Sequence, residues 1–220
     1  PVGLLIGKRF MVGKFIAGGA FGRLYIGTNV KTKEEVAIKM EKNTIDKPQL
    51  PLEFAFYKQL KADKNKPHKC IPKIHYFGPS GDWHALIMDL LGPSLENVHA
   101  KCDYKFSVKT TAMLAIQIIE AFEYFHGCHL IFRDTKPDNF LFGRSGTDDY
   151  STLHIIDLGL SKAYIDDDTK QHIEFKKGKG MTGTVRYMSL NNHKGYEVSR
   201  RDDLIATGYM LVFLAKGDLP

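Results

Sequence analysis

The sequence predicts an α+β protein with a strand-rich first part and a mainly helical second part. Short segments of alternating apolar residues, typical of strands, recur in the first 90 residues. The longest segments with apolar residues at helical spacing come later, at 107–125 and 204–215. The run from Leu91 to Ser94 contains glycine and proline, which interrupt regular structure. We therefore expect two lobes, 1–91 and 92–220, joined at this run.

The composition is that of an ordinary globular protein with a basic surface. Hydrophobic residues make up 43% and charged residues 25% of the 220 residues. The formal net charge of +6 favours acidic partners such as nucleotides, phosphorylated or acidic proteins, nucleic acids or anionic membranes. A solvated basic face would give the same charge, so the charge alone does not choose among these partners.

The cysteines and the apolar runs exclude several classes of protein. Cys70, Cys102 and Cys128 are widely spaced and form no paired motif, so we expect neither a disulfide framework nor a zinc site. The N-terminal apolar stretch is too short for a secretory signal. The apolar run at 204–215 is too short to span a bilayer and is more typical of a buried helix. We expect a cytoplasmic protein without a transmembrane segment.

The segment from Leu130 to Asn139 has the composition of a phosphoryl-transfer site. Asp134 is a carboxylate that can accept a proton, and Lys136 is a cation that can neutralise a phosphate. Asn139, five residues after Asp134, offers an oxygen ligand suited to Mg²⁺. Phosphoryl transfer requires such groups around one reacting phosphate. Because a pattern this short also arises by chance, its interpretation depends on the rest of the chain.

Two earlier segments carry features that suit a nucleotide. A glycine-rich turn at 17–22 lies between two predicted strands, and its backbone N–H groups can approach phosphates closely. A plain hairpin turn is the alternative. The next strand, 35–39, ends in Lys39, which requires an anionic partner if it is buried. Glu53, on a predicted helix at 52–60, is the candidate partner, although an exposed surface glutamate would look the same in sequence.

A third segment, 154–160, delivers a second candidate metal ligand. An apolar strand leads to Asp157, and Gly159 permits a sharp exit from the strand. A strand followed by aspartate and, two residues later, glycine is common at ordinary turns. The motif becomes specific only because it follows the segment 130–139. The following segment, 162–183, is polar and lysine-rich, and a solvated charge run is its simplest interpretation.

Taken in order, these motifs resemble those of a eukaryotic protein kinase, and of the casein kinase 1 family in particular. Arg133, Asp134 and Asn139 match the kinase catalytic-loop signature. The resemblance covers essentially the whole chain, and 132–144, 164–166 and 172–173 are closest to a gamma-like branch. The stretches that match the family most specifically are 90–96, 136–141, 182–187, 189–191 and 199–204.

The resemblance implies a bilobal kinase fold, with a small β-rich N-lobe and a larger helical C-lobe, acting as a serine/threonine kinase with Mg-ATP. It makes Asp134 the catalytic base and Lys136 the residue that steadies the transferred phosphate. Asn139 and Asp157 become the Mg²⁺ ligands. The resemblance assigns further residues to ATP, in the glycine-rich turn, the Lys39–Glu53 pair, the adenine pocket, the hinge and the metal site. They are Ile16, Ala17, Gly19, Gly22, Leu24, Ala37, Lys39, Glu53, Met88, Asp89, Leu91 and Asp157.

The resemblance also implies a class of substrate and a group of residues that bind it. The family prefers acidic or phosphorylated protein substrates, and Asp203 is expected to anchor the catalytic loop through Arg133. We expect a monomer that binds no nucleic acid, because an interleaved aromatic and basic platform is absent from the sequence. Nuclear or membrane association would depend on tail segments outside this chain. The residues expected to bind the substrate anion are Arg133, Lys162, Lys179 and Arg186.

Four positions depart from the family pattern, and none removes a catalytic charge. Ala17 replaces the first glycine of the turn, and Ile205 stands where the family usually has glutamate. Phe132 replaces histidine and Leu158 replaces phenylalanine, and both replacements keep an apolar packing group. A catalytically weak, kinase-like module that binds nucleotide or scaffolds partners is therefore the alternative function.

The family's domain continues beyond the last residues of this chain with a tryptophan and several helices. We therefore expect a C-terminally truncated domain with an exposed apolar patch on the helix at 204–215, and poor stability of the isolated 220 residues.

Overall fold

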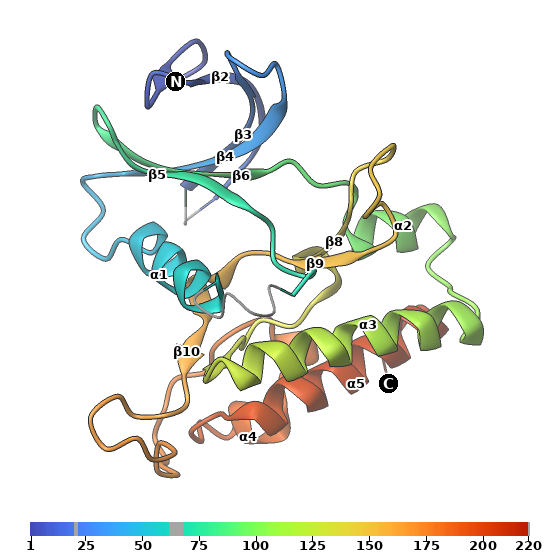
Figure 1. The fold of residues 1–220 in the computed structure, drawn as a ribbon. Helices are drawn as coiled ribbons and strands as arrows, with labels where there is room; N and C mark the ends of the chain where they lie inside the picture. Colours follow the sequence, from blue (N-terminus) through green and yellow to red (C-terminus); the bar gives the residue numbers. More distant parts are fainter. Residues whose placement is uncertain (20–21, 62–67, 220) are drawn as a thin grey trace. The chain divides into compact units, whose positions relative to one another are not determined.

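The computed structural model describes residues 1–19, 22–61 and 68–219. These residues form two compact units (Figure 1). The first contains Pro1–Lys58 and Pro72–Leu91, and the second contains Gln59–Ile71 and Gly92–Pro220. The second unit therefore includes a segment, Gln59–Ile71, that the sequence assigned to the first lobe.

The first unit is built on an antiparallel sheet of six strands with one helix, α1. The strand order is β1-β2-β3-β4-β6-β5, so β6 lies between β4 and β5. The strands predicted on both sides of the glycine-rich turn and at 35–39 are present, whereas the strand that the sequence predicts at 71–77 begins only at Ile74. The bounds are β1 Leu5–Ile6, β2 Phe10–Gly19, β3 Gly22–Asn29, β4 Glu35–Lys42, α1 Leu50–Lys61, β5 Ile74–Ser80 and β6 Trp83–Asp89.

Alternation along β4 separates a packed face of the sheet from a functional face. Val36, Ile38 and Met40 are buried in one apolar cluster that also includes Phe10 and Ile87. Because successive side chains of a strand point to opposite faces, the residues between them face the other side. The candidate nucleotide residues Ala37 and Lys39 therefore project from the face opposite this cluster.

Helix α1 begins at a carboxylate supplied by the sheet. The two oxygens of Glu41 accept hydrogen bonds from the backbone N–H groups of Gln49, at 2.9 Å, and Leu50, at 3.1 Å. This arrangement satisfies donors that a helix N-terminus leaves unpaired, and the negative charge suits the positive end of the helix dipole. Pro51 lies in the first helical turn, where its missing N–H costs nothing.

The second unit is mainly helical, with two small two-stranded sheets, β7–β10 and β8–β9. Three serines, Ser94, Ser107 and Ser189, accept hydrogen bonds from backbone N–H groups at the starts of their helices. The elements are α2 Leu95–Lys101, α3 Val108–Gly127, β7 Leu130–Ile131, β8 Phe140–Phe142, β9 Leu153–Ile155, β10 Lys162–Ala163, α4 Leu190–His193 and α5 Arg200–Lys216.

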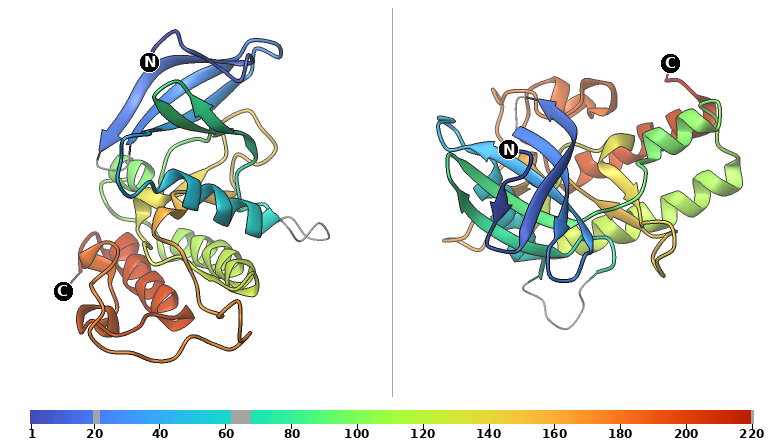
Figure 2. Two further views of the ribbon diagram at one scale, coloured as in Figure 1. Left: turned by 90° about the vertical axis from the view of Figure 1, so that its left-hand side faces the viewer. Right: turned by 90° about the horizontal axis from the view of Figure 1, so that it is seen from above.

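Helices α3 and α5 pack side by side along their length (Figure 2). Helical spacing predicts that Ala112, Ala115, Ile116, Ile119 and Phe122 form the buried stripe of α3. Phe122 is buried as predicted, but Ala112, Ile116 and Ile119 are exposed and Ala115 is only half-buried. Helix α3 carries two apolar stripes about one third of a turn apart, and helical spacing alone does not show which of them is buried. The residues of α3 that are buried are Leu114, Ile118, Ala121, Phe122 and Phe125.

Helix α5 is buried on one face and apolar on both. Met210, Phe213 and Leu214 lie in the core. The expected exposed apolar patch is present, with Leu204 47% and Val212 41% exposed. No helix among the described residues has the length and apolar character needed to cross a membrane.

Gly22, in the β2–β3 hairpin, is restricted by its backbone conformation and by its close contact with β4. Residues 20 and 21, at the centre of the predicted glycine-rich turn, lie outside the described residues. Gly22 follows them with φ of +121°, and a Cβ atom there would lie 2.4 Å from the carbonyl oxygen of Met40 on β4. Glycine is therefore required at this position by the packing of the hairpin on the sheet.

Replacing Gly22 by alanine is expected to destabilise the protein by about 1–3 kcal/mol, because the new methyl group meets β4 and φ is unfavourable. Gly19→Ala is the matched control, since a Cβ at Gly19 has nothing within 4 Å. Chemical denaturation of both variants measures the difference. Equal stabilities for the two variants would contradict the packing argument.

Candidate active site

The catalytic segment, residues 130–139, begins with β7. Phe132, the residue after this strand, is anchored in an aromatic core. Phe132 is fully buried, and its ring lies 5.9–6.3 Å from the rings of Phe122, Phe125 and Phe140. These distances and tilted or edge-on orientations are favourable for aromatic pairs. Phe132 therefore supplies the packing role that the sequence assigned to it.

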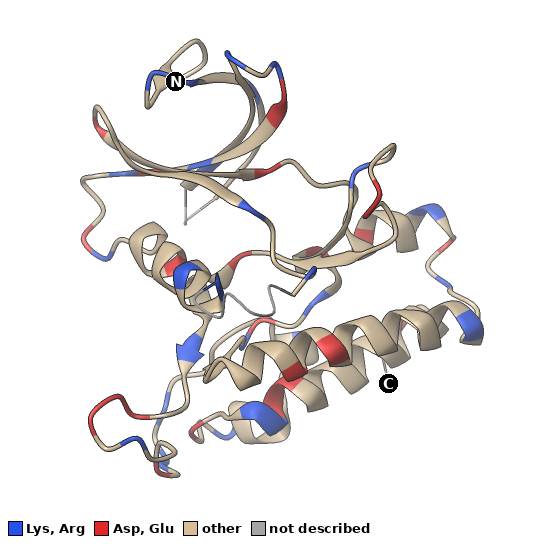
Figure 3. Ribbon diagram, in the orientation of Figure 1, with Lys and Arg blue, Asp and Glu red and all other residues tan. Residues whose placement is uncertain are grey.

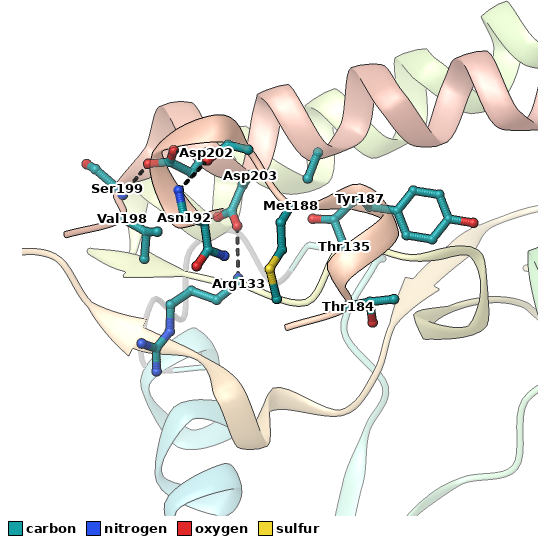
Figure 4. Close-up of a pocket in the computed structure, with 12 residues that line it drawn as sticks. Arg133, Thr135, Thr184, Tyr187, Met188, Asn192, Val198, Ser199, Asp202 and Asp203 are labelled. Carbon is teal, nitrogen blue, oxygen red and sulfur yellow. Dashed lines mark hydrogen bonds between the residues drawn. The ribbon is translucent and has the colours of Figure 1, made fainter. Parts of the chain in front are cut away.

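Asp203, on the first turn of α5, holds the backbone of the catalytic segment. Its carboxylate accepts hydrogen bonds from the backbone N–H groups of Phe132 and Arg133, both at 2.9 Å. Figure 4 shows the bond to Arg133. Nε2 of His126 lies 2.9 Å from the same carboxylate. The expected anchor thus acts on backbone atoms, and it holds Arg133 in the left-handed region at φ of +69°.

Asp134, the next residue, lies at the centre of a polar cluster. Its Oδ2 is 2.9 Å from Nζ of Lys136 and accepts a hydrogen bond from Nδ2 of Asn139 at 3.0 Å. The hydroxyl of Thr184 donates to Oδ1 at 2.7 Å. The carboxylate is held in one orientation on both oxygens, and the three residues expected to perform the chemistry are in direct contact.

Thr184 is a residue that the sequence placed in a family motif without giving it a role. Its approach depends on Gly183, which has φ of +101° and lies against the catalytic segment. A Cβ at Gly183 would lie 2.2 Å from the carbonyl oxygen of Arg133. The glycine–threonine pair could have signalled this contact, because only glycine permits the approach that brings the following hydroxyl to Asp134.

Asn139 and Asp157 lie at the same end of the β8–β9 hairpin. Phe140 is paired with Ile155, and the carbonyl oxygen of Asn139 accepts a hydrogen bond from the N–H of Ile156 at 3.0 Å. The amide nitrogen of Asn139 faces Asp134, which fixes the orientation of the amide group. A carboxylate and an amide oxygen on adjacent chains are hard oxygen ligands, so this donor set fits Mg²⁺.

In the first unit, Lys39 and Glu53 form the expected ion pair, with Nζ and Oε2 2.6 Å apart. The Glu53 side chain is only 2% exposed, so the alternative of an exposed surface glutamate is wrong. Lys39 is paired with Leu24 across β3 and with Leu86 across β6. The ammonium group is thereby fixed at the middle of the sheet, beside a buried carboxylate that supplies the partner a buried charge requires.

The other residues predicted to bind ATP are distributed over the same sheet. Ala17 pairs with Leu24, and Gly19 pairs with Gly22, in the β2–β3 hairpin. Ile16 and Ala17 are exposed, whereas Leu24 is half-buried. On the neighbouring strands Ala37 pairs with Met88, and both side chains are buried.

Asp89, at the end of β6, uses its carboxylate within the first unit. Oδ1 lies 2.7 Å from Nε2 of His75, and Oδ2 accepts a hydrogen bond from the backbone N–H of Lys73 at 2.8 Å. Burial opposes ionisation of Asp89, but these contacts outweigh it and hold the pKa of the carboxyl below its ordinary value. Leu91 is the last residue of the unit and is half-buried.

The cations expected to bind the substrate anion are only partly assembled as predicted. Lys162 and Lys179 both form ion pairs with Glu197, a residue to which the sequence gave no role. Burial lowers the pKa of the nearby Arg133 guanidinium, and the charge of Glu197 opposes this shift. Arg186 has a different neighbour, since its guanidinium lies over the Phe213 ring at 5.4 Å.

Replacing Asp203 by asparagine is expected to reduce stability by about 2–4 kcal/mol, because a buried backbone N–H loses its charged acceptor. Asp148→Asn, at an exposed carboxylate in a polar loop, is the control and should be nearly neutral. Urea unfolding followed by circular dichroism measures both. A cost below 1 kcal/mol for Asp203→Asn would contradict the anchoring role.

Thr135, the residue that follows Asp134, provides a second test of this region. Its hydroxyl is buried and has no hydrogen-bond partner among the described residues, and it lines a cavity of about 20 Å³. Thr135→Val is expected to stabilise the protein by about 1 kcal/mol, because it removes a buried hydroxyl without a partner. Thr207→Val should destabilise it, since that hydroxyl donates to the Asp203 carbonyl at 2.8 Å. Urea midpoints that shift in the same direction would contradict this assignment.

Comparisons with known proteins agree with this geometry. The chain is 45% identical over 216 residues to casein kinase I homolog 1 of Saccharomyces cerevisiae, which confirms the predicted resemblance to the casein kinase 1 family. The match covers 98% of this chain but only 39% of that relative. The family model described as protein kinase domain matches residues 10–220. The chain therefore belongs to the protein kinase family.

Proposed function

We propose that the chain carries the catalytic activity of a serine/threonine protein kinase that uses Mg-ATP and prefers acidic or phosphorylated protein substrates. The main support is the cluster around Asp134, in which a buried carboxylate contacts Lys136, Asn139 and Thr184. Such a cluster places a proton acceptor, a cation and a metal ligand within one hydrogen-bond network.

In the proposed reaction, Asp134 accepts the proton of the substrate hydroxyl as its oxygen attacks the γ-phosphorus of ATP. The bond between that phosphorus and the oxygen of the leaving ADP breaks. Lys136, beside Asp134, stabilises the negative charge on the transferred group. Hydrogen bonds on both oxygens of Asp134 hold the carboxylate so that little reorganisation is needed during the transfer.

The metal and the nucleotide have separate residues assigned to them. Asn139 and Asp157 are the proposed ligands of Mg²⁺, which supplies charge neutralisation at the phosphate oxygens. In the first unit, Lys39 is the proposed ligand of the α- and β-phosphates, and its ion pair with Glu53 keeps its ammonium group in place. Ala37 and Met88 are the proposed apolar contacts of the adenine ring.

Several finer predictions belong to this proposal. The chain is expected to act as a monomer in the cytoplasm, with nuclear or membrane association depending on other segments. Its place in a gamma-like branch also stays a prediction. The alternative of a catalytically weak scaffold is less well supported, because Lys39, Asp134, Asn139 and Asp157 are all retained.

The test is incorporation of labelled phosphate from Mg-ATP into casein by the full-length protein and its Asp134→Asn variant. The variant is expected to lose about 10²–10⁴-fold in kcat, because the proton acceptor is lost while nucleotide binding remains. Asp148→Asn is the charge-matched control and should retain activity. A wild-type protein that binds ATP but transfers no phosphate would instead favour the scaffold.

A further inference from the structure

Glu197 lies at the centre of the cations that the sequence assigned to substrate recognition. Its Oε1 is ion-paired with Nζ of Lys162, and its Oε2 lies 3.2 Å from Nζ of Lys179. Lys162 belongs to β10, and Lys179 belongs to the loop that follows it, where further basic positions appear in Figure 3. A strand and the loop that follows it thus deliver two ammonium groups to a single carboxylate.

The carboxylate is a fixed part of this cluster. Glu197 is 7% exposed, and its backbone N–H donates to the carbonyl oxygen of Lys176 at 2.8 Å. Its own carbonyl oxygen accepts a hydrogen bond from Nη2 of Arg201 at 3.2 Å. Burial opposes ionisation, but the ammonium groups of Lys162 and Lys179 outweigh it and lower the pKa of the carboxyl. Glu197 therefore stays in place and negatively charged at neutral pH.

The lysine side chains of this cluster are more exposed to solvent than the carboxylate that they bind. The side chains of Lys162 and Lys179 are 31% and 46% exposed, whereas the Glu197 side chain is 8% exposed. An ammonium group has three N–H donors, so each lysine can bind Glu197 and also offer donors to solvent. The site has a buried anion beneath partly exposed cations, and an anion from solvent can reach the cations without displacing Glu197.

We propose that Glu197 is a built-in counter-ion that weakens the binding of anionic substrate groups to Lys162, Lys179 and the neighbouring Arg133. This inference rests on the proposed function, because it takes acidic or phosphorylated proteins as the substrates. The three cations carry a charge of +3, which Glu197 reduces to +2. An incoming phosphate or carboxylate group gains attraction from the cations but is repelled by the fixed carboxylate below them.

Glu197 could act in the opposite sense if its main effect were to hold the two lysines together. Its loss would then scatter the ammonium groups and weaken anion binding. We favour the counter-ion role because a phosphate has several oxygens and can bridge the lysines itself, whereas the repulsion from Glu197 is present only when the anion is bound. The two roles predict opposite signs for the same substitution.

The experiment compares wild-type, Glu197→Gln and Glu197→Asp forms of the full-length protein, with inorganic sulfate as the probe. Calorimetric titration is expected to show sulfate binding about five- to tenfold tighter for Glu197→Gln, because glutamine keeps the shape but removes the charge. Glu197→Asp retains the charge and should bind sulfate like the wild type. Unchanged or weaker binding by Glu197→Gln would overturn the proposal.

A kinetic measurement extends the test to substrates. The KM for a phosphorylated acidic peptide is expected to fall by a similar factor in Glu197→Gln, while the KM for an uncharged peptide of the same length should change far less. A parallel change for both peptides would indicate a structural effect and would overturn the proposal. Sulfate binding does not require catalysis, so a wild-type protein without transfer activity would refute the proposed function and leave the calorimetric result interpretable.

A second variant covers the case in which Glu197→Gln does not fold. Lys179→Met removes one partly exposed cation of the cluster and leaves Glu197 in place. It is expected to weaken sulfate binding at least severalfold, because the site then carries less net positive charge. Sulfate binding equal to that of the wild type would show that these cations do not form an anion site, and would overturn the proposal.

Discussion

The carboxylate of Asp203 is the constraint on which the candidate active site depends. It joins the first turn of α5 to the backbone of Phe132 and Arg133, and it holds Arg133 in a conformation that side chains rarely adopt. The next residue, Asp134, is thereby turned towards Lys136 and Asn139. The orientation of the proposed base is thus set by a buried hydrogen-bond acceptor that itself takes no part in the chemistry.

Other buried carboxylates of the described residues are also held by specific partners. Glu41 accepts backbone N–H groups at the start of α1, Glu53 pairs with Lys39, and Glu197 pairs with two lysines. Burying an unpaired charge is costly, so each carboxylate fixes the position of its partner. For Lys39 the result is a cation held at the proposed nucleotide site. For Glu197 the result is a cluster that keeps cations near the surface but reduces their net charge.

The sequence predicted features that depend on local patterns and failed on features that depend on packing. Alternating residues located most of the strands. The strand that ends in Lys39 called for an anionic partner, and the structure selects Glu53 from the two interpretations that the sequence left open. The buried face of α3 was predicted only in part. Phe122 is buried as expected, but Ile116 and Ile118 are equally apolar, and only the packing of other elements on α3 decides which one is covered. No local pattern in the sequence predicts the contacts of Glu197, because its partners are lysines 18 and 35 residues away in sequence.

The departures from the family pattern are absorbed by local structure. Ala17 lies within β2 and pairs with Leu24, so its methyl group is accommodated as a strand residue, whereas the nearby Gly22 is required by contact with β4. Leu158 is fully buried, as the apolar residue expected at its position should be. Because these substitutions change packing groups and leave every ion pair of the site intact, their effects should appear in stability and nucleotide affinity before they appear in the chemistry.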